Sequence, residues 1–169
     1  MKNKHGIILL FSSLLVSSCG YQFEGGRYLY ENVPDVAVSV MENKSSESGA
    51  GITFTNALIR EIIEKTDTKV VDASEASMIL KGSVNSITFS TLSRSTSESA
   101  IERNVSATID IKLLDRDGAI IWSVKGVSSD EAYTVSEDAI ADETNKREAV
   151  DIIADRSAEK VVSKMTANF

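Results

Sequence analysis

The chain has 169 residues, with 18 Lys and Arg against 25 Asp and Glu, so its formal net charge is −7 at pH 7. An acidic chain is a poor general binder of nucleic acid, because that affinity comes mainly from Lys and Arg neutralising phosphates. The length suits one domain with a substantial hydrophobic core.

The first 18 residues have the pattern of a secretory signal peptide. Lys2 and Lys4 precede an apolar run over residues 7–16, and small residues follow it. A bilayer span needs roughly 20 apolar residues, so this run is too short to be one. We expect cleavage before Cys19, which leaves 16 basic and 25 acidic residues and a net charge of −9. We also expect a helix drawn over residues 1–18 to be absent from the mature protein.

Cys19 is the only cysteine, and the sequence Val-Ser-Ser precedes it directly. This arrangement resembles the bacterial lipoprotein box, in which the cysteine is acylated, with palmitate among the usual chains. The resemblance implies a lipid-anchored protein, since several acyl chains hold a protein firmly on a membrane. Gly20 stands where an aspartate would signal inner-membrane retention, so we expect the outer membrane, on the periplasmic side. The alternative is an ordinary signal peptide followed by an incidental thiol.

Signal cleavage would also remove His5, the only histidine. A mature chain with neither histidine nor free thiol lacks the groups of most nucleophilic triads and zinc sites. Residues 157–160 match Ser-x-x-Lys, but the Lys-Thr-Gly element of penicillin-recognising enzymes is absent. Residues 115–118 read Asp-Arg-Asp-Gly, and Gly126 stands where a calcium loop needs its closing Glu. We therefore expect no enzyme activity, no catalytic residue, no metal site and no cofactor.

The hydrophobic pattern predicts a lead-in over residues 19–35 and one domain over residues 36–169. Periods of two and of 3.6 residues separate strands from helices. In chain order they predict a strand at 36–40, a helix at 52–65, strands at 69–71 and 78–91, an exposed Ser/Thr-rich tip at 91–99, a strand at 104–113, a tight turn at 115–118, a strand at 119–129, an acidic linker at 130–143 and a long terminal helix.

These elements predict an α+β fold built as a two-layer sandwich. The last three strands follow one another as an antiparallel meander, whereas the first strand, helix and next strand form a crossover. Each helix has one apolar face, so both pack on the same side of the sheet. We expect a mixed, mostly antiparallel sheet of about four to five strands, with two helices on one face and the other face bare.

The bare face is the candidate functional surface. With Leu80, Ile111 and similar residues directed at the helices, alternation places the lysines of three successive strands on the opposite face. We expect Ile87 and Phe89 to share that face nearer the hairpin tip. The basic candidates for binding an anionic amphiphile or a partner protein are Lys81, Lys112, Lys125, Arg94 and Arg103. The alternative is a set of scattered, solvated lysines with Asp110 among them.

The order of the motifs resembles the lipopolysaccharide-assembly lipoprotein family, LptE. The matching segments are Cys-Gly-Tyr-Gln-Phe at 19–23, Met-Glu-Asn-Lys-Ser at 41–45, Thr-Asn-Ala-Leu at 55–58, Met-Ile-Leu-Lys-Gly at 78–82, the Ser/Thr-rich hairpin, residues 115–122 and the terminal helix. The resemblance implies a lipoprotein that sits inside the outer-membrane barrel LptD as its plug and assembly partner. It also implies binding of lipopolysaccharide on its way to the outer leaflet, without covalent chemistry. No family contact residue transfers to a particular position.

A second resemblance stays open. Residues 36–82 also look like the strand, helix and strand that open lipoproteins regulating peptidoglycan synthases or building secretion pores. A regulator that reaches across the periplasm usually has a long flexible tether after its lipid. The short lead-in after Cys19 favours the LptE reading.

Overall fold

The computed structural model describes residues 28–31, 33–94 and 101–167. The signal peptide, Cys19 and most of the hairpin tip therefore lie outside the described residues. No helix within the described ranges is both long enough and apolar enough to cross a membrane.

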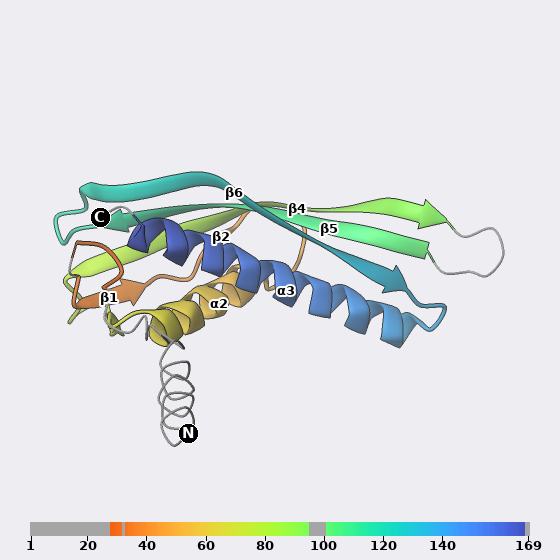
Figure 1. The fold of residues 1–169 in the computed structure, drawn as a ribbon, viewed down its shortest axis with the longest axis horizontal. Helices are drawn as coiled ribbons and strands as arrows, with labels where there is room; N and C mark the ends of the chain where they lie inside the picture. The colour runs from red at the N-terminus through yellow and green to blue at the C-terminus, as the bar shows by residue number, and fades with distance from the viewer. Residues whose placement is uncertain (1–27, 32, 95–100, 168–169) are drawn as a thin grey trace, which may run out of the picture.

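The sheet is mixed and the fold is α+β, as predicted. Its strand order is β3-β1-β4-β5-β6, and β2 also pairs with β4. β1 runs parallel to β3 and β4, whereas β4, β5 and β6 are antiparallel to one another. The sheet has six strands, two of which are only two residues long. The elements are β1 Asp35–Val38, β2 Glu42–Asn43, α2 Ala50–Lys65, β3 Lys69–Val70, β4 Met78–Arg94, β5 Ile101–Leu114, β6 Ile120–Val135 and α3 Ala139–Thr166 (Figure 1).

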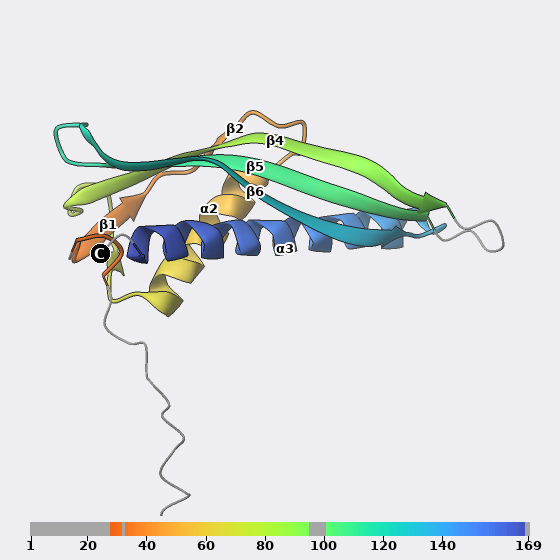
Figure 2. The same cartoon turned by 45° about the horizontal axis from the view of Figure 1, so that its top comes forward.

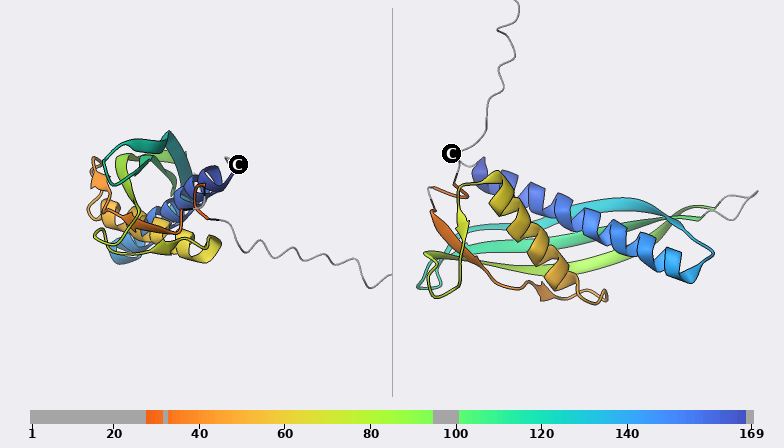
Figure 3. Two further views of the ribbon diagram at one scale, coloured as in Figure 1. Left: turned by 90° about the vertical axis from the view of Figure 1, so that its left-hand side faces the viewer. Right: turned by 90° about the horizontal axis from the view of Figure 1, so that it is seen from below.

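Both helices cover the same face of the sheet, which confirms the predicted two-layer sandwich (Figure 2). Viewed from one end, the strands curl around the helix layer (Figure 3). The core joins both layers, and its largest fully buried side chains include Phe54, Leu58, Ile62, Leu80, Ile109, Ile111, Leu113, Ile153 and Met165. Within the described residues, no helix covers the opposite face of the sheet.

The long hairpin and the following turn form largely as the pattern predicts. Val105, Ala107, Ile109, Ile111 and Leu113 of β5 are all buried. The turn at 115–118 uses Gly118 at φ 84°, a left-handed conformation that suits glycine. The Asp115 carboxylate accepts the N–H groups of Asp117 at 3.0 Å and Ala119 at 2.8 Å. This Asx-type turn explains the sharp reversal between β5 and β6.

A β-bulge in β4 overturns the prediction for Ile87 and Phe89. The pairing register with β5 shifts between Val84 and Ser86, so one residue has no partner. An extra residue moves every later side chain to the opposite face. Ile87 is therefore buried in the core and Phe89 packs against it from the helix side. The bare face loses both apolar residues.

The predicted acidic linker is also wrong. Residues 130–135 continue β6, and α3 already begins at Ala139. Asp138 caps the helix, since its carboxylate accepts the N–H groups of Ile140 and Ala141, each at 2.9 Å. In the strand, Glu131 is neutralised by Arg156 of α3, so an acidic segment can lie in the sheet.

The hydroxyl of Ser129 gives a first testable prediction. Ser129 is buried on β6, and its Oγ has no hydrogen-bond partner in the part of the chain that the structure describes. A buried hydroxyl without a partner costs free energy. We expect Ser129→Ala to leave the free energy of unfolding unchanged or to raise it by up to about 1 kcal/mol in urea denaturation. Ser157→Ala is the control, because the Ser157 hydroxyl donates to the Ile153 carbonyl at 2.7 Å. A clear loss of stability in Ser129→Ala alone would contradict this reading.

Candidate functional site

Three of the five basic candidates meet on the bare face of the sheet. Lys81 of β4, Lys112 of β5 and Lys125 of β6 line one open groove of about 550 Å³. The remaining lining comes from the same three strands, from β2 with the residues on either side of it, and from the β5–β6 turn: Ser39, Val40, Glu42, Lys44, Gly82, Ser83, Asp110, Leu114, Gly118 and Ile120. The alternation argument placed these three lysines correctly.

The lysines of this groove have like charges side by side. Lys81 and Lys112 are directly opposite each other in the β4–β5 register, an arrangement that destabilises a sheet. Within the described residues, neither they nor Lys125 form an ion pair. The nearby acidic groups have other partners: Asp110 accepts the Gly126 N–H at 2.8 Å, and Glu42 pairs with Lys44 at 3.2 Å. The groove thus contains four lysines against two carboxylates, a formal charge of +2.

Apolar side chains line the same groove. Val40 and Ile120 are exposed by 68% and 54%, and Leu114 adds a half-buried side chain. Exposed aliphatic groups next to unpaired lysines fit a ligand with both acyl and anionic parts. Sequence reasoning missed Lys44 and Ile120, since the Ser-rich segment around Lys44 gave no sign that β2 would pair with β4.

The structure does not bring Arg103 and Arg94 to this groove. Arg103 lies on the helix side of β5, with its guanidinium 5.8 Å from the centroid of the Phe89 ring. Tyr133 packs against the same ring edge-on, with centroids 6.5 Å apart. Arg94 is the last residue of β4, about 40 Å along the strand from Lys81. We expected both arginines beside the bare face near the hairpin tip; this is wrong for Arg103, which lies on the helix side, and the side chain of Arg94 lies outside the described residues.

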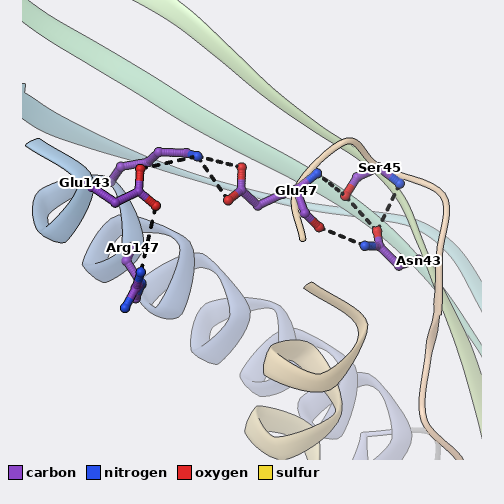
Figure 4. A network of polar contacts seen from close by, with 6 residues as sticks. Asn43, Ser45, Glu47, Glu143 and Arg147 are labelled. Carbon is purple, nitrogen blue, oxygen red and sulfur yellow. Dashed lines mark hydrogen bonds and ion pairs between the residues drawn. The ribbon is translucent and has the colours of Figure 1, made fainter. Parts of the chain in front are cut away.

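A network of polar side chains joins the loop after β2 to α3 (Figure 4). Lys146 of α3 binds Glu47 at 2.8 Å and lies 5.2 Å from the centroid of Phe89. Asn43 stabilises the loop between β2 and α2: its side chain donates to the Glu47 carbonyl at 2.7 Å and accepts the Ser45 N–H at 3.0 Å. The network ties the loop after β2 to α3, so its role is structural.

The helix layer is acidic where the sheet face is basic. Burial raises the pKa of Glu61 on α2, and the carboxylates of Glu159, Glu64 and Asp155 add to the rise, against the opposing charge of Lys65. A carboxyl whose pKa is higher in the folded than in the unfolded protein stabilises the fold while it is protonated. That contribution to the free energy of unfolding is lost as pH rises through the folded-state pKa.

We therefore expect Glu61→Gln to raise the free energy of unfolding slightly at pH 7, and this gain to vanish below about pH 4. Denaturant titrations at several pH values measure it. Glu148→Gln, at an exposed residue of α3, is the control for removing one carboxylate from the helix layer. Equal stability of wild type and Glu61→Gln at all pH values would contradict the raised pKa of Glu61.

Comparison with known families adds an independent observation. The family model described as "LptE: Lipopolysaccharide-assembly" matches residues 33–165, which is most of the chain. The chain belongs to the LptE family. The match spans all the secondary-structure elements except the end of α3. No curated protein sequence matches the chain.

Solved structures of bacterial lipoproteins share the fold. A lipoprotein from Caulobacter crescentus CB15 is 17% identical, with a TM-score of 0.54, and the match covers 76% of this LptE-family chain and 88% of that chain. Lipoprotein B from Nitrosomonas europaea is 17% identical, with a TM-score of 0.53 and coverages of 83% and 87%. A minor lipoprotein from Acinetobacter baumannii is 11% identical, with a TM-score of 0.50 and coverages of 80% and 92%. At such identities the likeness concerns the fold alone.

Proposed function

We propose that this protein is an outer-membrane lipoprotein that partners and plugs the LptD barrel and assists transport of lipopolysaccharide to the outer leaflet. Acylated Cys19 would hold it on the periplasmic side. The observation that carries the proposal is the LptE family match over residues 33–165. We assign it no covalent chemistry.

The groove supports direct binding of lipopolysaccharide. This lipid presents phosphate groups beside acyl chains, and the groove presents Lys81, Lys112 and Lys125 beside Val40 and Ile120. Lysine binds phosphate as a point charge. We propose that the phosphates contact the three lysines while the aliphatic side chains meet the first part of the acyl chains.

The charge distribution supports one orientation of binding. The lysines of the groove lie on the bare face, whereas Glu61, Glu64 and Glu159 gather on the helix layer. An anionic lipid is attracted to the first surface and repelled by the second. The sheet face would then meet the lipid, and the helix layer would face away from it.

Affinity purification of the full-length acylated protein from membranes tests the barrel partnership. We expect an LptD-type barrel to co-purify. A Cys19→Ser variant is the control, because without the acyl chains it should lose its membrane anchor and with it most of the barrel. Recovery of a peptidoglycan synthase without any large barrel would refute the proposal.

A further inference from the structure

One carboxylate lies among the lysines of the groove without pairing with them. Asp110 of β5 lines the groove together with the three lysines, and its negative charge repels an anionic ligand. In the described ranges it forms no ion pair. Its Oδ1 atom instead accepts the N–H group of Gly126 in β6 at 2.8 Å. Asp110 therefore contacts the backbone next to Lys125.

Asp110 is opposite two residues of β6 instead of one. The pairing register between β5 and β6 shifts at this position, so Lys125 and Gly126 together occupy the place of a single partner. Gly126 has φ 68°, a left-handed conformation that suits glycine. This arrangement is a β-bulge, and bulges often redirect a side chain next to a functional site.

The bulge allows Lys125 to lie on the bare face between two residues that contact the core. Val124 and Val127 both reach the core, although side chains three positions apart in a regular strand point to opposite faces. The extra residue removes this conflict. The peptide group that joins Lys125 to Gly126 carries the N–H that Asp110 accepts. The hydrogen bond therefore fixes the backbone from which the lysine side chain extends.

We propose that Asp110 is a positioning residue for lipopolysaccharide binding, because it holds the bulge that directs Lys125 into the groove. This role depends on the lipid binding proposed above. Lysine has a flexible four-carbon stem, so fixing its backbone reduces the ordering cost when the ligand binds. The carboxylate then has two opposite effects on the same ligand. Its charge weakens binding, whereas its hydrogen bond strengthens binding.

Two substitutions that remove the same charge separate these effects. Asp110→Asn keeps an oxygen that can accept the Gly126 N–H, whereas Asp110→Ala leaves this exposed N–H to solvent. If only charge mattered, both variants would bind an anionic lipid equally and more tightly than wild type. Asp110 does not belong to the buried core, so both variants should fold.

Direct binding of purified lipopolysaccharide to the full-length acylated protein in detergent measures the difference. We expect Asp110→Asn to bind about two- to fivefold more tightly than wild type. We expect Asp110→Ala to bind about three- to tenfold more weakly than Asp110→Asn, because the bulge has lost its acceptor. Urea denaturation of each variant separates weakened binding from partial unfolding.

A second pair of variants tests whether Asp110 acts through Lys125. In a Lys125→Ala background, Asp110→Asn and Asp110→Ala should bind lipopolysaccharide with equal affinity, because the side chain that the bulge positions is absent. A difference that keeps its full size in this background would give Asp110 only a structural role and would overturn the proposal.

The outcomes distinguish the positioning role from the lipid binding on which it depends. Clear binding by wild type with equal affinities of Asp110→Asn and Asp110→Ala would overturn the positioning role and leave lipid binding intact. A wild-type protein that binds no lipopolysaccharide would refute direct lipid binding and the positioning role with it.

Discussion

Replacing Phe54 by alanine is expected to lower the free energy of unfolding by about 3–5 kcal/mol. Phe54 lies on α2, is only 1% exposed and is among the largest fully buried side chains. Its removal leaves a cavity between the helix layer and the sheet, which adds to the lost burial. Because small domains have a total stability of about 5–15 kcal/mol, the variant should denature at much lower urea concentration.

Ile52→Ala is the matched control for this prediction. Ile52 lies on the same helix, but 59% of it is exposed, so its truncation should change the free energy of unfolding by less than about 0.5 kcal/mol. Similar losses in both variants would mean that α2 does not pack on the sheet through Phe54. Circular dichroism during urea titration measures both.

Reversing two lysines of the groove is expected to abolish most lipopolysaccharide binding. We expect Lys81→Glu with Lys112→Glu to weaken binding to purified lipopolysaccharide about a hundredfold, or about tenfold per lysine. The fold should be unharmed, since both side chains are exposed and the reversal retains one like-charge pair. Direct binding measured at two salt concentrations should also show a weaker salt dependence in the variant.

The double variant Lys65→Glu with Lys164→Glu controls for net charge. It changes the charge of the protein equally, but both residues are exposed on the helices, on the other layer. Its affinity for lipopolysaccharide should stay close to that of wild type. If both double variants lose affinity equally, only the net charge matters and the groove is not the site.

The sequence predicted the parts of the fold that local patterns determine. The alternation in β5 gave the buried face correctly, and Asp115 with Gly118 located the turn. The same alternation also places Arg103 on the face of Val105, so its position on the helix side could have been recognised. Lys81, Lys112 and Lys125 were placed correctly because no unrecognised irregularity intervenes between them and the buried residues used as reference.

Non-local interactions account for the errors. The bulge between Val84 and Ser86 depends on pairing with β5. Its residues include no glycine or proline from which a bulge could be predicted. Residues 130–135 look like a linker because Asp130 and Glu131 are charged. Arg156, far along the chain on α3, pairs with the Glu131 carboxylate and donates to the Asp130 carbonyl, while the Asp130 side chain stays exposed. Such compensation becomes visible only when both elements are placed in space.

Depletion of this protein in its own bacterium tests the central claim most directly. The account predicts that lipopolysaccharide at the cell surface falls on depletion and that plasmid-borne wild type restores it. The Lys65→Glu, Lys164→Glu variant should also restore it, whereas the Lys81→Glu, Lys112→Glu variant should not. Surface lipopolysaccharide that stays at its normal level in depleted cells would contradict a role in lipopolysaccharide assembly.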